Sequence, residues 1–272
     1  MPAETSTAPL PEQLPLEGIR TTLRAENLIK SFHRRTVVRG IDIHVRTGEV
    51  IALLGRNGAG KTTTFHMIVG LQKPDSGSIY LDDKDISRYT SPQRAKAGLT
   101  YLPQENSVFL KTSVENNLKM ILEIAGHGKT ETQRLAADLL EELGLTDLAR
   151  QSAHSLSGGE RRRLEICRAL VLDPKFLLLD EPFTGIDPLT IIDLQRILLR
   201  LRSRGIGIII SDHNVRDAMK ITDRAYIVDE GEILIQGTPR EVSADETARA
   251  RFLGKGFHLG EEVQVYSSDE NK

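Results

Sequence analysis

The fold is decided by the stretch Val50-Ile51-Ala52-Leu53-Leu54-Gly55-Arg56-Asn57-Gly58-Ala59-Gly60-Lys61-Thr62-Thr63. Its apolar half predicts a buried strand, its glycines predict a turn, and the residues that follow predict a helix. In such a turn, backbone N–H groups surround a polyphosphate, while Lys61 reaches the outer phosphates and Thr62 offers a hydroxyl to Mg²⁺. A glycine-rich turn that binds nothing is the alternative, but the flanking strand and helix favour a nucleoside triphosphate site. We expect it to consist of Gly55, Asn57, Gly58, Ala59, Gly60, Lys61, Thr62 and Thr63.

Composition limits the class of partner. The chain has 272 residues, enough to bury its own core, and 36 basic against 38 acidic residues leave a net charge of -2. Since this balance creates no global positive field, we expect no nucleic-acid partner. The basic triplet at 161–163 is interpreted as a solvated helix face. Cys167 has no second cysteine to pair with, and its apolar helical neighbours indicate a core position.

The N-terminal segment and the hydropathy pattern suggest a location. No stretch approaches the roughly eighteen apolar residues that a membrane-spanning helix requires. The N-terminus lacks the basic-then-apolar order of a secretion signal, so we expect a cytoplasmic protein. Residues 1–19 are rich in proline and small polar residues, which predicts a flexible tail.

The remaining pattern predicts an α/β fold. Short segments at 41–45 and 78–81 read as antiparallel strands beside the phosphate-loop strand. The runs 176–179 and 206–210 are apolar throughout, as in central parallel strands that are covered on both faces. Leucines recur at helical spacing between about 105 and 172, which predicts a helical insertion. We therefore expect a P-loop NTPase core with a parallel sheet, an antiparallel β subdomain and an inserted α-helical subdomain, over residues 20–245 with an extension at 246–272.

Two carboxylates follow a predicted buried strand. Asp180 and Glu181 end the run Phe176-Leu177-Leu178-Leu179. In a parallel sheet this end lies near the phosphate loop, so Asp180 is suited to hold Mg²⁺ and Glu181 to deprotonate the attacking water. The alternative is a helix N-cap pair, because Asp-Glu-Pro also starts helices.

A second glycine motif precedes another predicted helix. Ser157, Gly158, Gly159 and Glu160 stand at its start, where N–H donors and the helix dipole favour an anion. Together with the phosphate loop, the Asp180-Glu181 pair and later histidine and glutamine residues, this order resembles the ATP-binding cassette (ABC) ATPases. The resemblance covers roughly residues 22–245.

The resemblance implies roles for further residues. Phe32 matches an aromatic residue that stacks on adenine, although a Phe packed in the strand layer is the alternative. Gln104 matches a glutamine that senses Mg²⁺ and the γ-phosphate and couples the core to the helical insertion. Asp187 matches a loop that crosses between protomers. His213 matches a histidine at the γ-phosphate, although a lone histidine is more often structural. The resemblance implies ATP and Mg²⁺ as cofactors, a metal site of Thr62, Gln104 and Asp180, and catalysis by Glu181, His213, Gln104 and Lys61.

In this family the serine-glycine signature of one subunit closes over the ATP of another. A single cassette therefore implies a homodimer. Because no membrane span is predicted, the resemblance implies two separate integral membrane subunits, with this chain peripheral on the cytoplasmic face of the inner membrane. The motifs are most similar to those of lipopolysaccharide-export ATPases, with Glu160 and the run Asp212-His213-Asn214-Val215-Arg216 as discriminating features. Arg56 and Leu110 depart from that pattern. The alternatives are the ATPase of a branched-chain amino-acid importer and a non-transport ABC ATPase, and no direct contact with the transported substrate is expected.

Phe109 follows Gln104 closely, at the start of the predicted insertion. Its large apolar side chain either fills the core of the helical subdomain or lines a groove that receives a helix of a membrane subunit. We favour the coupling groove, because the preceding segment 103–107 is polar and resembles a loop.

Overall fold

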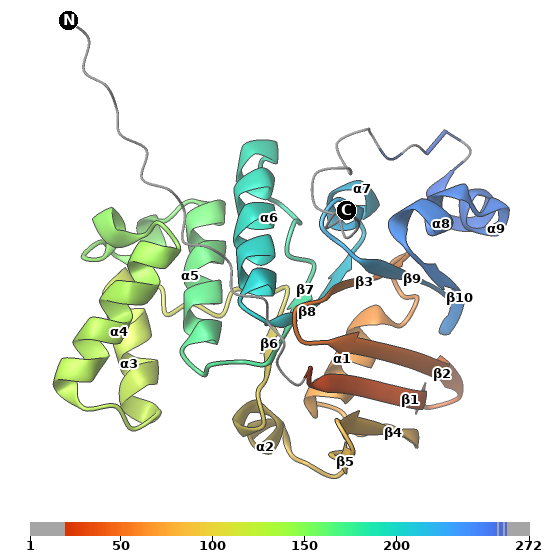
Figure 1. Cartoon of the computed structure of the whole chain (residues 1–272), viewed down its shortest axis with the longest axis horizontal. Helices are drawn as coiled ribbons and strands as arrows, with labels where there is room; N and C mark the ends of the chain where they lie inside the picture. The colour runs from red at the N-terminus through yellow and green to blue at the C-terminus, as the bar shows by residue number, and fades with distance from the viewer. Residues whose placement is uncertain (1–19, 255, 258, 260–272) are drawn as a thin grey trace, which may run out of the picture.

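The computed structural model describes residues 20–254, 256, 257 and 259 (Figure 1). The predicted tail at 1–19 and the end of the predicted C-terminal extension lie outside these residues. Within the described part, the strands form two separate sheets.

The larger sheet has six strands in the order β10-β9-β3-β8-β7-β6. Strand β3 pairs in parallel with β8 and β9, and β7 pairs in parallel with β8 and β6. The predicted parallel strands at 176–179 and 206–210 are thus confirmed, because the first run lies in β7 and 207–210 lies in β8, and both strands are fully buried. Their bounds are β3 Val50–Gly55, β6 Leu99–Leu102, β7 Phe176–Asp180, β8 Gly207–Asp212, β9 Arg224–Asp229 and β10 Glu232–Gly237.

The smaller sheet is antiparallel and contains four strands in the order β2-β1-β4-β5. The prediction that these strands lie beside the phosphate-loop strand was wrong, because β3 pairs with β8 and β9 instead. Their alternating pattern specifies one buried face, and that face packs over helix α1 rather than extending the parallel sheet. The bounds are β1 Thr22–Phe32, β2 Arg35–Arg46, β4 Ser76–Leu81 and β5 Lys84–Asp85.

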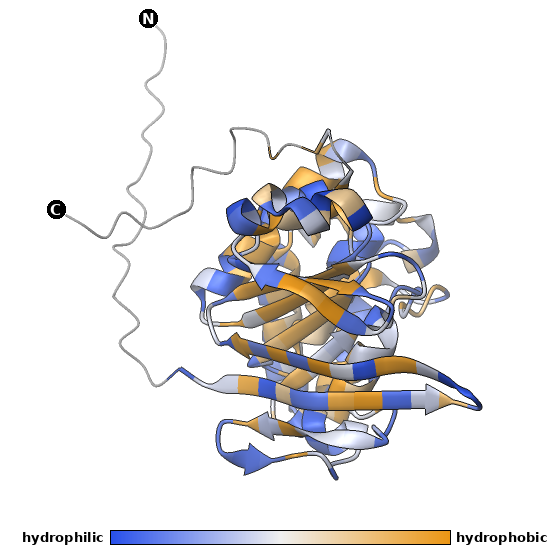
Figure 2. Ribbon diagram, turned by 90° about the vertical axis from the view of Figure 1, so that its right-hand side faces the viewer, coloured by the Kyte–Doolittle hydropathy of each residue, from blue (hydrophilic) through white to orange (hydrophobic). Residues whose placement is uncertain are grey.

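The two faces of the parallel sheet pack against different layers. In β3, Ile51 and Leu53 face the cluster that contains α1 (Lys61–Val69) and the antiparallel sheet. Alternate residues of the same strand, such as Ala52, belong to the cluster with the helices on the other side. Figure 2 shows the hydrophobic strands in the interior with hydrophilic segments around them. This two-sided burial explains why β3 is apolar at every position before its final glycine.

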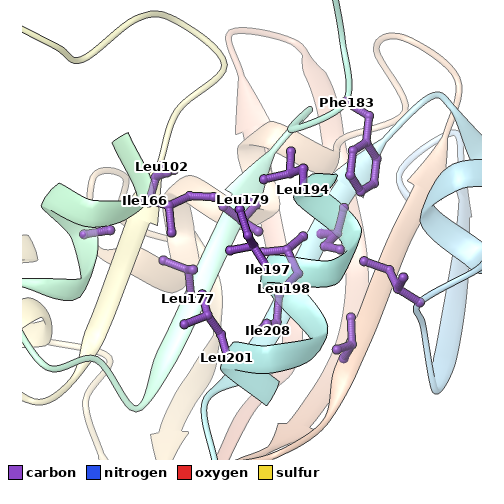
Figure 3. Packing of buried hydrophobic residues seen from close by; sticks show 14 of the residues in the cluster. Leu102, Ile166, Leu177, Leu179, Phe183, Leu194, Ile197, Leu198, Leu201 and Ile208 are labelled. Carbon is purple, nitrogen blue, oxygen red and sulfur yellow. The ribbon is translucent and has the colours of Figure 1, made fainter. Parts of the chain in front are cut away.

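Helix α6 (Pro188–Ser203) covers the second face. Figure 3 shows its apolar side chains directed at those of strands β7 and β8. Helix α5 (Gly158–Leu170) packs beside α6, and Cys167 on it is buried as predicted. The labelled side chains in this layer are Leu177, Leu179, Leu194, Ile197, Leu198, Leu201 and Ile208.

Helices α3 (Val114–Ile124) and α4 (Lys129–Glu142) pack together at one end of the molecule (Figure 1). They fall in the segment predicted as the helical insertion, whose limits at about 105 and 172 stay a prediction. The short helices in and before this segment are α2 Ser91–Lys96, η1 Thr146–Leu148 and η2 Ala153–Ser155.

The opposite end carries the C-terminal elements (Figure 1). They are α7 Val215–Met219, α8 Pro239–Ala244, α9 Glu246–Ala248 and the π-helical turn η3 Arg249–Leu253. Among the described residues, none of the helices is long and apolar enough to cross a membrane.

Candidate functional site

Two glycines allow the phosphate loop to pass close to its neighbours. A Cβ atom on Gly55 would lie 2.4 Å from the carbonyl oxygen of Val228, which no side chain tolerates. Gly60 has a φ of +109°, and a Cβ atom there would lie 2.9 Å from the carbonyl oxygen of Val37. The loop therefore needs glycine at both positions, for close approach at Gly55 and for its left-handed backbone at Gly60.

Lys61 lies inside this loop. Its Nζ donates to the carbonyl oxygens of Gly55 at 2.8 Å and Arg56 at 3.2 Å. Burial lowers the pKa of the Lys61 ammonium, and the nearby carboxylates of Glu181, Asp180 and Asp212 oppose that shift. The positive charge of Lys61 and the negative charges of these carboxylates therefore lie close enough to influence each other. A site for both a phosphate and a cation needs charges of both signs. Of the other loop residues, Ala59 is buried, Thr63 is half-buried, and Asn57, Gly58 and Thr62 are exposed.

Arg56, which departs from the family pattern of the phosphate loop, contacts the C-terminal elements. Its Nη2 donates to the carbonyl oxygen of Arg251 at 2.7 Å. The Arg251 guanidinium in turn pairs with Asp229 at 2.7 Å. The side chain of Arg56 thus points away from the loop interior and toward η3.

Asp180 ends β7 and is 1% exposed. Its Oδ1 accepts a hydrogen bond from the hydroxyl of Ser211 on the adjacent strand β8. Its Oδ2 accepts one from the Tyr101 hydroxyl at 3.2 Å. Burial and the Asp180 carboxylate raise the pKa of Tyr101, so its hydroxyl stays protonated and donates. Both oxygens of this buried carboxylate are therefore held by hydroxyl groups.

Glu181 is the meeting point of several segments. Its Oε2 accepts hydrogen bonds from Gln104 Nε2 at 3.0 Å and Thr184 Oγ1 at 3.1 Å, and His213 Nδ1 lies 3.3 Å away. Its backbone has a φ of +46°, which is uncommon for a residue with a side chain. The helix-cap alternative for Asp180-Glu181 was wrong, because turns follow and α6 begins at Pro188. The structure thus brings Gln104, Glu181 and His213 together, and a carboxylate held in this way can accept a proton from water.

Asp212 is a further member of the site, although no role in it was predicted for this residue. This buried carboxylate at the end of β8 accepts hydrogen bonds from the backbone N–H groups of Phe183 at 3.0 Å and Asn214 at 2.8 Å. Burial raises its pKa, and the two N–H groups counteract that shift. It joins the loop after Glu181 to the loop that carries His213. The sequence signals for such a role were its position at the end of an apolar strand and its place beside His213.

The signature residues form a second cluster on α5 and α6. Ser157 Oγ accepts from Glu160 N at 3.3 Å and Glu160 Oε2 accepts from Ser157 N at 2.8 Å, a capping box that also lowers the pKa of Glu160. Asp187 caps α6 through Thr190 N at 3.0 Å. A Cβ atom on Gly159 would lie 2.1 Å from Thr190 Cγ2, so this glycine permits the close packing of the two helix starts. Gly158 is exposed beside them.

Within the described residues, no hydrogen bond or salt bridge joins this second cluster to the phosphate loop. Among these residues, Ser157, Gly158, Gly159 and Asp187 therefore have no polar contact with the phosphate loop of their own chain.

Phe32 lies at the end of β1 and is 41% exposed, so the alternative of a Phe packed in the strand layer was wrong. Lys30 Nζ lies 5.9 Å from its ring centroid. Close to the β1–β2 hairpin, a cavity of about 380 Å³ runs from Arg35 and Val37 to the phosphate loop at Asn57. The start of β2 thus forms a wall of the space beside the loop.

Phe109 is 50% exposed, and the Arg168 guanidinium stacks 4.6 Å from its ring centroid. A side chain that fills a core would be buried, so the core alternative does not hold. Leu110, the second departure, is partly buried against the helical core instead.

The chain is similar to known proteins over most of its length. The sequence profile described as ABC transporter matches residues 38–184. The lipopolysaccharide export system ATP-binding protein LptB of Acidithiobacillus ferridurans is 50% identical over 237 residues, which cover 87% of this chain and 98% of that protein. LptB of Escherichia coli strain K12 is 47% identical over 88% of this chain and 99% of its own length.

A solved structure of an ATP-binding cassette has the same fold as this chain. The ADP conformation of MJ1267, an ATP-binding cassette of an ABC transporter, superposes with a TM-score of 0.78 and 28% identity, and covers 86% of this chain and 99% of that one. The family match and the two relatives extend over the phosphate loop, the end of β7 and the capped start of α5. The chain belongs to the ABC transporter family and is an ATP-binding ATPase of that family.

Proposed function

We propose that Glu181 is the general base of ATP hydrolysis and that Thr62, Gln104 and Asp180 hold Mg²⁺. These three residues offer hydroxyl, amide and carboxylate oxygens, which are the ligands that Mg²⁺ prefers. When bound, the metal supplies positive charge that polarises the phosphate oxygens. The observation that supports the base assignment is the convergence of Gln104, Thr184 and His213 on one oxygen of Glu181.

Each residue then has a defined task. Lys61 directs its ammonium to the outer phosphates, and the loop N–H groups of 55–63 surround them. Glu181 removes a proton from the attacking water. Gln104 and His213 restrict the rotation of the Glu181 carboxylate, and His213 lies on the exposed side, where it reaches the γ-phosphate. Phe32, exposed near the cavity beside the loop, stacks on the adenine ring.

The active form is a homodimer in which the second cluster of one protomer faces the phosphate loop of the other. Its support is that, among the described residues, Ser157, Gly158, Gly159 and Asp187 make no hydrogen bond or salt bridge to the phosphate loop of their own chain. A cluster with a capped helix start and exposed N–H donors has the chemistry of an anion site. The dimer completes each ATP site.

At the level of the cell, this chain powers lipopolysaccharide export from the cytoplasmic face of the inner membrane, together with two integral membrane subunits. The observation that carries this conclusion is the identity of 47% to 50% with two LptB proteins over nearly their whole length. The half-exposed Phe109 supplies an apolar contact for a membrane subunit, while the transported molecule need not touch the ATPase.

Complementation tests the transport function. An Escherichia coli strain depleted of its own LptB should regain growth and surface lipopolysaccharide when it expresses this chain with its cognate membrane subunits. The matched control is the Glu181→Gln chain, which should express equally and fail to restore either. Failure of the unchanged chain, together with its copurification with the permease of an amino-acid importer, would overturn the assignment.

The base and the dimer are tested on one purified variant. Glu181→Gln keeps the shape and removes the basicity, so turnover should fall by roughly 10² to 10⁴-fold while ATP binding survives. With MgATP, light scattering should show a dimer of this variant, and adding Ser157→Arg should abolish it. Near-normal turnover of Glu181→Gln would mean that another residue is the general base. A dimer that persists with Ser157→Arg would mean that the interface lies on another surface.

A further inference from the structure

Tyr101 connects the phosphate-loop helix to the end of β7. It lies on β6, and its hydroxyl is 3.2 Å from Asp180 Oδ2 and 3.2 Å from His66 Nε2. His66 belongs to α1, the helix that begins at Lys61. The Tyr101 ring stands edge-on to Phe65 at 6.4 Å and to His66 at 5.6 Å between ring centroids. Packing on α1 therefore fixes the ring and directs its hydroxyl at Asp180.

The direction of the hydrogen bonds follows from the donors present. Asp180 is a carboxylate and accepts, so the Tyr101 hydroxyl donates to it. The same oxygen then has only a lone pair for His66, whose Nε2 must carry the proton. The chain of donation runs from His66 through Tyr101 to Asp180. Charge-assisted hydrogen bonds of this kind are stronger than neutral ones.

We propose that Tyr101 is a positioning residue that orients the Asp180 carboxylate, and that the hydrogen bond with His66 orients the Tyr101 hydroxyl. This inference rests on the proposed role of Asp180 at Mg²⁺. Ser211 holds Oδ1 from the neighbouring strand, and Tyr101 holds Oδ2 from the other side. With both bonds the carboxylate cannot rotate about its Cβ–Cγ bond. With Ser211 alone, Oδ2 is left without a donor in a site that is 1% exposed.

The three residues come from separate elements, so their arrangement links the position of α1 to the carboxylate. His66 lies one turn after Thr62, the hydroxyl that we assign to the metal. Tyr101 lies just before Gln104, the third proposed ligand. The hydrogen bonds of the Tyr101 hydroxyl thus connect α1, which carries Thr62, with Asp180 at the end of β7, and Tyr101 itself lies on β6, the strand before Gln104.

The experiment measures the affinity of the fluorescent analogue TNP-ATP with Mg²⁺ and with EDTA. Tyr101→Phe removes only the hydroxyl, so affinity in EDTA should stay the same while the gain on adding Mg²⁺ falls about tenfold, the lower end of the effect of residues that orient metal ligands. Tyr226→Phe is the matched control, because its hydroxyl is also on a strand residue but accepts a hydrogen bond from Arg224 at 2.8 Å instead. It should leave the gain unchanged.

A second pair of variants distinguishes the loss of the hydrogen bond from a loss of fold. His66→Phe keeps the Tyr101 hydroxyl and removes its donor, so the Mg²⁺-dependent gain should fall by a smaller factor than in Tyr101→Phe. His66→Gln retains an N–H donor and should restore part of it. Thermal melting of each variant identifies any loss of fold.

The outcomes separate this inference from the proposed function. If Asp180→Asn leaves the Mg²⁺-dependent gain intact, Asp180 does not serve the metal and the proposed function is wrong at that residue. If Asp180→Asn abolishes the gain while folded Tyr101→Phe and His66→Phe keep it in full, the positioning role of Tyr101 is overturned alone. An equal loss of affinity in EDTA and in Mg²⁺ would also overturn it, since that pattern reports general damage to the nucleotide site.

Discussion

Truncation of Phe109 distinguishes a docking residue from a core residue. Full burial of a Phe side chain is worth about 1.5–3 kcal/mol, so a side chain that is 50% exposed stabilises the fold by about half of that. The stacked Arg168 adds about 0.5–1 kcal/mol. Phe109→Ala should therefore cost the isolated chain about 1.3–2.5 kcal/mol, against about 3–5 kcal/mol for a buried Phe.

The backbone at this position should survive the change. Asn117 holds it from both sides, because Oδ1 accepts from Phe109 N at 2.9 Å and Nδ2 donates to Phe109 O at 3.0 Å. We expect the melting temperature to fall by about 3–10 °C, since 1 kcal/mol corresponds to about 2–4 °C in a domain of this size. Association with the membrane subunits should weaken much more, because aromatic anchors carry a few kcal/mol of an interface.

The assay pairs thermal melting of the isolated variant with pull-down of the membrane subunits. Phe65→Ala is the control for core damage, since Phe65 is fully buried, and Leu71→Ala is the control for loss of an exposed apolar side chain elsewhere. The reasoning is refuted if Phe109→Ala melts as low as Phe65→Ala, or if its association and transport match those of Leu71→Ala.

Two further predictions concern α5. Gly159→Ala should lower the melting temperature, because the new Cβ atom meets Thr190 Cγ2 at 2.1 Å; the double variant with Thr190→Ser, which lacks that methyl group, should recover most of the loss, and an equal loss in both would disprove the clash. Cys167 is buried, and burial raises the pKa of its thiol, so Ellman's reagent should react with it only after unfolding, and fast reaction in the native protein would contradict this.

Residues that are adjacent in the chain were the ones that sequence reasoning could place. The phosphate loop, the Asp180-Glu181 pair and the Ser157 helix start were all recognisable, because each is a short run whose strand, turn and helix propensities agree with its chemistry. The burial of β7 and β8 followed in the same way from runs without a polar residue.

Tertiary structure decided which of these runs meet. Gln104 and His213 reach Glu181 only because β6, β7 and β8 are neighbours in the sheet. No local sequence pattern predicts the order of strands in a sheet. The antiparallel sheet was predicted, but its place in the fold was not, because alternation marks a buried face but not the element that covers it.

The hydrogen bonds of the site had the same origin. The Tyr101 hydroxyl finds His66 and Asp180 across three elements, and the positive φ of Glu181 depends on the surrounding strands that hold it. The sequence by itself thus determined the chemical groups and the local elements that carry them, since propensity and spacing act over a few residues. Which groups share one oxygen, and in what orientation, was decided by packing between distant segments, because only the folded chain brings their side chains within hydrogen-bonding distance.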